Sequence, residues 1–226
     1  MLKNRAEAII NTENLAHNFK KIRAMAGGSR VISVVKADAY GHGAAECAHV
    51  IERCGGDMFA VASADEGAAL RESGIAGDIL VLGISTAEEQ KRLHEFDLIQ
   101  SVASREYADE LGALGYPVRI HIKIDTGMSR LGFYCHGEED TAAAYEAVRD
   151  ALEKNKNLKC EGVFTHFACS DEPYDSMTRR QFGAFSAFCG LCEKGGLRLG
   201  MRHCCNSAAI VNFPEMHLDA VRAGIL

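Results

Sequence analysis

Short β-branched apolar runs alternate with longer amphipathic stretches rich in Ala, Glu and Leu along the whole chain. The short runs have the length of strands, and the longer stretches place apolar residues at helical spacing. This alternation predicts parallel strands joined by right-handed helical crossovers. The predicted strands span 31–35, 58–62, 79–83, 98–102, 118–124, 159–164, 200–204 and 218–221. The predicted helices span 12–26, 44–54, 64–73, 86–95, 104–114, 138–154, 176–194 and 207–212.

The number of predicted strands favours one architecture. Eight strands favour a closed (β/α)8 barrel of the TIM type over an open doubly wound sheet, so the predicted fold class is α/β with a barrel over residues 11–226. Residues 1–10 contain the alternating segment RAEAII, which has no partner in this rhythm and is expected to be an orphan strand. The chain stops at RAGIL, where a barrel normally continues into a closing helix, so we expect it to be part of a longer protein.

Composition narrows the class of protein. The chain has 226 residues, 47% of them hydrophobic, and a net charge of −6, so it can bury a core without disulfides or metal. Its longest apolar runs, such as 31–35 and 79–84, are far shorter than a membrane span, and its N-terminus lacks the features of a signal peptide. Mild acidity argues against nucleic-acid binding. We therefore expect a cytoplasmic globular protein that binds neither nucleic acid nor membrane.

The cysteines suggest a reducing compartment. There are nine, an odd number that fits free thiols better than disulfides. Cys189 and Cys192 have the CxxC spacing of zinc or redox sites, and Cys204 and Cys205 follow. However, the CxxC pair lies in an apolar, helix-like stretch, and no second CxxC stands at zinc-finger spacing. We expect small buried side chains and no metal site.

Polar clusters follow several predicted strands, where the sites of such barrels lie. In VVKADAYGHG (34–43), Lys36 leaves an apolar strand, and a desolvated lysine there can act as an amine nucleophile. Tyr40 in the same turn can reach an anion. In KIDTGMSRLGF (123–133), Arg130 offers a planar fork for a carboxylate or phenolate. The alternative interpretation of this second cluster is a solvated ion network.

Three further clusters complete the picture. His166 in FTHFACSD is either a core residue or a ring that stacks on an aromatic heterocycle. Asn206 and Ser207 in HCCNSAAI form either an ordinary helix N-cap or an anion site, above all for phosphate. In VRAGI, Gly224 permits close backbone approach to a ligand, and Arg222 lies at the same rim. An amine, an aromatic ring and a phosphate cup are the layout that pyridoxal 5′-phosphate requires.

In their order, these five motifs resemble the N-terminal barrel domain of bacterial alanine racemases, from about residue 5 to 226. The resemblance implies that Lys36 carries the cofactor and acts as a catalytic residue together with Arg130. It implies that Arg130 and Met128 contact substrate, and that His203 orients Arg222. Lys123 would hold the arginine of its motif and is carbamylated in some family members. The implied cofactor-binding residues are Lys36, Tyr40, His166, Asn206, Ser207, Arg222, Gly224 and Ile225.

Departures from the family pattern are local, with one exception. Small residues replace others beside functional positions, giving RAG for RPG and HCCNS for HAANS. The exception is the family's C-terminal β domain, which supplies a second catalytic tyrosine, a phosphate-binding tyrosine and most dimer contacts, and which is absent here. The resemblance implies a racemase that interconverts L- and D-alanine for peptidoglycan, working as a homodimer whose site the partner's C-terminal domain completes. The present chain alone is expected to have little or no activity.

Other functions share parts of this pattern. A non-catalytic single-domain protein that binds pyridoxal 5′-phosphate has this barrel and nearly this length. A serine-preferring or broad-specificity racemase uses the same barrel motifs. A cofactor-free aldolase barrel would use the lysine alone. KxDTGMxRLG together with HCCNSAA favours the racemase.

Overall fold

The fold is described from a computed structural model that covers residues 8–225. Residues 8–10 have no regular secondary structure, and the rest of the segment expected to be an orphan strand, residues 1–7, lies outside the described residues. Among the described helices, none is both long enough and apolar enough to cross a membrane.

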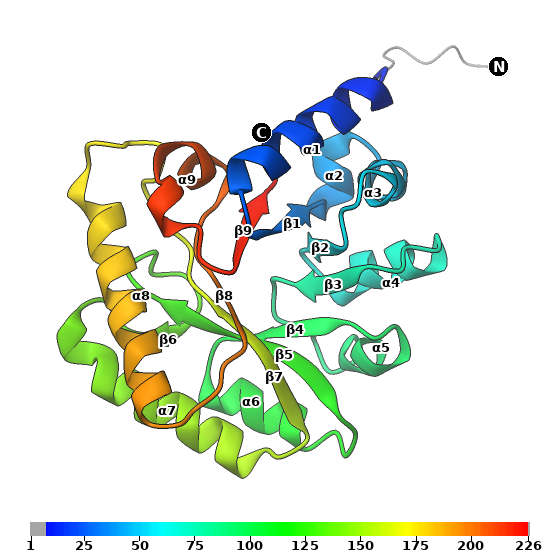
Figure 1. Cartoon of the computed structure of the whole chain (residues 1–226). Helices are drawn as coiled ribbons and strands as arrows, with labels where there is room; N and C mark the ends of the chain where they lie inside the picture. Colours follow the sequence, from blue (N-terminus) through cyan, green and yellow to red (C-terminus); the bar gives the residue numbers. More distant parts are fainter. Residues whose placement is uncertain (1–7, 226) are drawn as a thin grey trace.

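Parallel strands close into the predicted barrel (Figure 1). The hydrogen-bonded order is β4-β3-β2-β1-β9-β8-β7-β5, and a β4–β5 pairing completes the ring. A short additional strand, β6 (Phe133–Tyr134), pairs with β5 and was not predicted. The barrel strands are β1 (Arg30–Val34), β2 (Met58–Val61), β3 (Asp78–Val81), β4 (Ile99–Val102), β5 (Val118–Asp125), β7 (Leu158–Phe164), β8 (Met201–His203) and β9 (Ala220–Ala223).

Helices surround the barrel, and most lie where the sequence predicts them (Figure 1). The 3₁₀ segments are η1 (Glu138–Asp140) and η2 (Pro214–Met216). The α-helices are α1 (Thr12–Ala26), α2 (Lys36–Gly41), α3 (Ala44–Arg53), α4 (Ala64–Glu72), α5 (Gln90–Glu95), α6 (Arg105–Gly112), α7 (Thr141–Lys154), α8 (Ser176–Lys194) and α9 (Ser207–Asn212).

Helix α5 and strand β9 both begin later than the sequence predicts. Helix α5 begins four residues late, because the amide of Thr86 donates to the Glu89 carboxylate and residues 87–89 form a turn. Strand β9 lies two residues later than predicted, because Leu218 adopts a left-handed backbone with φ of 55°. The amide of Arg202 then donates to the Asp219 carboxylate at 2.8 Å and fixes the entry to the strand.

Both faces of the strands are buried, which explains their nearly continuous apolar sequences. Helix α1 packs against β1, β9 and α9, and therefore covers the seam between the last strand and the first (Figure 1). Side chains that point into the barrel form a separate apolar layer. That layer consists of Ile32, Met58, Ala60, Leu80, Ile99 and Ala220.

Below this layer, an ion network closes the amino end of the barrel. The Asp78 carboxylate accepts hydrogen bonds from Arg30 at 2.9 Å and from Arg119 at 2.8 Å. Arg119 also donates to Glu161 at 2.8 Å. These groups satisfy one another within the network. The opposite end, at the carboxyl ends of the strands, is where a reaction site can form.

Candidate active site

Lys36 leaves β1 at the carboxyl end of the barrel, as predicted, and begins a turn of unusual hand. Four successive residues, 37–40, have φ between 51° and 55°, a left-handed conformation that residues with a Cβ rarely adopt. The turn brings Tyr40 against Gly224 at the end of β9, where a Cβ would lie 2.7 Å from the Tyr40 hydroxyl oxygen. Glycine is therefore required at position 224 for the phenol to reach this place.

Beside that phenol, two backbone amides converge on one hydroxyl. The N–H groups of Gly224 and Ile225 both donate to Oγ of Ser207, at 3.0 Å each. Asn206 caps α9 as predicted, because its Oδ1 accepts from the amide of Ala209 at 3.0 Å. Tyr40, Ser207 and the amides of Gly224 and Ile225, all predicted to bind phosphate, therefore lie together. The side-chain oxygen of Asn206, also predicted to bind the cofactor, is used to cap α9.

Arg222 is buried within the barrel, and its guanidinium donates to four neighbouring residues, one of them Cys204 through its carbonyl oxygen at 3.1 Å. Its guanidinium bonds to His203 Nδ1 at 3.0 Å, to His166 Nδ1 at 3.2 Å and to the carbonyl oxygen of Thr165 at 2.8 Å. A guanidinium only donates, so both imidazoles accept at Nδ1 and carry their proton on Nε2. The predicted contact between His203 and Arg222 is present, and its direction is fixed.

The chain of imidazoles extends one step further, to a residue that the sequence reasoning missed. Nε2 of His203 lies 3.0 Å from Nδ1 of His121, on β5, and must donate to it. Burial lowers the pKa of His121 to about 3 and that of His203 well below its usual range, so both rings are neutral. A Cβ at Gly162 would lie 2.5 Å from the His121 ring, which explains the glycine in β7. The alternation of side chains along a strand could have identified His121. It is two residues from Lys123, so both side chains lie on the same face of β5.

Lys123 is 7% exposed, and no carboxylate of the described residues forms an ion pair with its amine, which is unusual for a buried lysine. Its Nζ donates to the carbonyl oxygen of Ile124 at 3.3 Å and lies 5.1 Å from the centre of the Phe164 ring. Burial, and secondarily the positive charge of Arg222, lower the pKa of this amine to about 7. Lys123 is therefore partly neutral at physiological pH.

The loop after β5 carries the other residues of the second cluster. Oδ1 of Asp125 accepts from the amides of Gly127 and Ser129, at 3.0 Å each, and this shapes the turn. Met128 on the loop is half-buried, and Arg130 is exposed at the rim. Asp125 is thus a loop-shaping residue rather than a free carboxylate.

The pKa of His166 reflects the cations that surround it. Its pKa is lowered to about 3, first by burial and then by the positive charges around it. These charges belong to side chains at the ends of three different strands, β1, β5 and β9, so the rim is strongly electropositive. The cations are Arg222, Lys123, Arg130 and Lys36.

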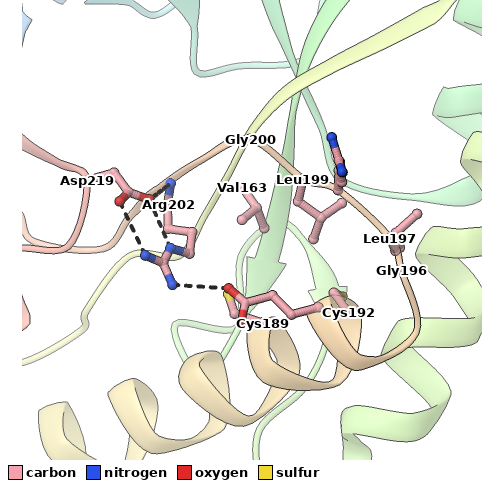
Figure 2. Close-up of a pocket in the computed structure, with 11 residues that line it drawn as sticks. Val163, Cys189, Cys192, Gly196, Leu197, Leu199, Gly200, Arg202 and Asp219 are labelled. Carbon is pink, nitrogen blue, oxygen red and sulfur yellow. Dashed lines mark hydrogen bonds and ion pairs between the residues drawn. The ribbon is translucent and has the colours of Figure 1, made fainter.

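The hollow in Figure 2 lies elsewhere, between α8 and β8 at the amino end of the barrel. Its volume is about 590 Å³, and Cys189, Cys192 and the Arg202–Asp219 ion pair contribute to its lining. Both thiols belong to the core, as predicted, and burial raises their pKa to about 12, so they are protonated and unreactive. Among the described residues, no three His, Cys, Asp or Glu side chains are grouped to hold a metal ion. The carboxyl end of the barrel remains the candidate site.

Comparison with known proteins agrees with this geometry. Residues 10–226 match the family described as alanine racemase, N-terminal domain. The alanine racemase of Desulfovibrio desulfuricans is 41% identical over 224 residues, which are 97% of this chain and 58% of that protein. That of Methanococcus maripaludis is 39% identical, with the same coverage. The chain thus spans a little over half the length of these curated relatives.

Solved structures give the same result. The alanine racemase of Clostridium difficile in complex with cycloserine superposes with a TM-score of 0.88 at 35% identity, over 96% of this chain and 59% of that one. The alanine racemase of Bacillus anthracis with bound L-Ala-P gives 0.86 at 31% identity, over 95% of this chain and 55% of that one. By sequence and by fold, the chain belongs to the alanine racemase N-terminal domain family.

Proposed function

We propose that this chain is the barrel domain of an alanine racemase that binds pyridoxal 5′-phosphate through Lys36. One observation carries the proposal. The amine of Lys36, just after β1, shares its rim with a converging set of donors: the Ser207 hydroxyl, the amides of Gly224 and Ile225, and the Tyr40 phenol. Hydroxyls and backbone amides are the groups that bind phosphate.

The residues present fit the cofactor. Ser207, Tyr40 and the two amides would hold the phosphate, because all four groups are neutral hydrogen-bond donors. His166 presents a neutral ring at the rim, suited to stacking on a heterocycle. When bound, the cofactor would act as an electron sink and make the α-proton of an amino acid acidic.

Arg222 would set the electronic character of that sink. Burial lowers its pKa to about 10, so it remains a cation at neutral pH. It donates to two neutral imidazoles, and within residues 8–225 it bonds to no carboxylate. With the cofactor bound, the Arg222 cation would oppose protonation of the ring nitrogen. Arg222 would thereby favour proton transfer at the α-carbon over side reactions such as transamination.

Two residues would act on the substrate itself. Lys36 would remove or return the α-proton on one face, and Arg130 would bind the substrate carboxylate beside Met128. A group on the opposite face would come from a tyrosine of the partner subunit's C-terminal domain, as the family resemblance implies. We therefore propose that the complete protein is a cytoplasmic homodimer that supplies D-alanine for peptidoglycan, and that alanine is preferred over serine.

Covalent trapping tests the cofactor proposal. The chain is incubated with pyridoxal 5′-phosphate and reduced with borohydride, and the labelled peptide is mapped. Lys36 should be labelled and should lose the label after Lys36→Arg substitution. Lys123→Arg is the matched control, because it removes the other rim lysine and should leave the label on Lys36. Label on a different lysine, or none, would refute the proposal.

A further inference from the structure

The left-handed turn after Lys36 raises the question of what holds it. Such a conformation is unfavourable for residues with a Cβ and persists only when its surroundings enforce it. Its far end is fixed by Asp38, whose carboxylate accepts from the amide of Ala44 at 2.7 Å. Its near end, which carries Lys36, is fixed from a different barrel unit.

That contact comes from Glu66 on α4. One carboxylate oxygen accepts from the amide of Ala37 at 2.9 Å, and the other from the amide of Ala62 at 2.7 Å. These two amides follow β1 and β2 just beyond their ladder, in which Val35 N–H still donates to the carbonyl of Ala60. A single side chain therefore joins the carboxyl ends of two adjacent strands.

The local sequence would assign Glu66 a different task. Ser63 and Glu66 have the spacing of a capping box, in which the glutamate reaches back to the amide of the N-cap residue. The Ser63 half is present, with Oγ accepting from the Glu66 amide at 3.3 Å. The carboxylate, however, bonds to the residue before the cap and to the lysine turn. It is used between barrel units rather than within its own helix.

We infer that Glu66 is a positioning residue for Lys36: its carboxylate clamps the left-handed turn and so directs the amine and Tyr40 into the site. The inference rests on the proposed function, because the consequence of correct positioning is covalent capture of the cofactor. A carboxylate suits this place because it accepts two hydrogen bonds at once, whereas the amide of a glutamine has one accepting oxygen. Bonds to a charged acceptor are also stronger than neutral ones.

The chain offers a matched control. At the opposite end of the barrel, Glu52 also accepts from two backbone amides, those of Ala76 and Gly77, at 2.9 Å each, although both bonds go to the single oxygen Oε1. Like Glu66, it is half-buried on a helix. Glu66→Gln and Glu52→Gln therefore each remove a negative charge that bonds to two backbone amides, one beside Lys36 and the other far from it. Glu66→Gln in addition removes one of the two accepting oxygens that Glu66 uses.

Two measurements on these variants test the inference. Amide hydrogen exchange by NMR follows Ala37 and Ala62 without any cofactor. The rate of borohydride-trapped incorporation of pyridoxal 5′-phosphate follows Lys36. Glu66→Gln should speed exchange at both amides by ~10-fold or more and slow incorporation at Lys36 by ~10-fold, from the loss of a charge-assisted bond. Glu52→Gln should change neither, even if it lowers the melting temperature equally.

The outcomes separate the two proposals. Incorporation at an unchanged rate in Glu66→Gln, or an equal slowing in Glu52→Gln, would overturn the inference and leave the proposed function intact. No label on Lys36 in the unsubstituted chain would overturn the proposed function and, with it, this inference. If Glu66→Gln does not fold, Glu66→Asp and Glu52→Asp provide the same comparison, because each keeps the charge but shortens the side chain and so draws the carboxylate away from the two amides to which it bonds.

Discussion

The pair of buried imidazoles beneath Arg222 makes the stability of the protein sensitive to acid. His121 is 1% exposed and its pKa is lowered from 6.5 to about 3 by burial. Below pH 6.5 the unfolded chain therefore binds a proton at this residue that the folded chain does not. Stability from the neutral ring is present above pH 6.5 and is lost as pH falls towards 3.

The size of the effect follows from the shift. Between pH 6.5 and pH 5, one histidine that stays neutral in the folded state costs about 1.6 kcal/mol of unfolding free energy. We predict that His121→Asn reduces the loss of stability over this interval by about that amount. Asparagine is chosen because its Oδ1 can take the place of Nδ1 and still accept the hydrogen bond from His203.

Urea unfolding at the two pH values measures this difference, which is independent of any constant cost of the substitution. His17→Asn is the control, because His17 is exposed on α1, and it should retain the pH dependence of the unsubstituted chain. The interval lies above the range in which most carboxylates titrate. If His121→Asn loses as much stability as the unsubstituted chain between the two pH values, the neutral, buried imidazole is the wrong explanation.

Three further predictions concern the ion network, Lys123 and catalysis. Asp78→Asn should lower the unfolding free energy by about 1–3 kcal/mol in urea titrations, because it weakens bonds to two arginines, whereas Asp57→Asn, at a carboxylate 64% exposed, should cost less than about 1 kcal/mol. In ¹³C-bicarbonate, Lys123 should give a carbamate signal by NMR that rises with pH through about 7, since only the neutral amine reacts; a signal that persists in Lys123→Arg would contradict this. In D₂O, the chain with pyridoxal 5′-phosphate should exchange the α-proton of D-alanine but produce little L-alanine, because an acid or base missing from one face lowers the rate ~10²–10⁴-fold. Rapid formation of L-alanine would contradict this prediction and would mean that the 226-residue chain contains a second acid–base residue.

The sequence by itself determined the barrel and the placement of its chemistry. Alternating strand-length and helix-length periods require parallel pairing, and in a parallel barrel all carboxyl ends meet at one rim. Lys36, Arg130, His166 and Ser207 each follow a predicted strand, so their convergence could be expected without coordinates. Local signals sufficed for α1, α8 and α9, whose bounds match the prediction.

Only the tertiary structure decided how these residues are held and charged. The pairing of His121 with His203 joins residues 82 positions apart and depends on strand register, which local pattern does not specify. The left-handed turn after Lys36 is unfavourable in isolation and exists because Glu66, from the next barrel unit, accepts its first amide. The neutral state of His166 and the lowered pKa of Lys123 arise from burial among cations contributed by separate strands. Desolvation and charge proximity are properties of the assembled rim, because no segment of the chain produces them alone.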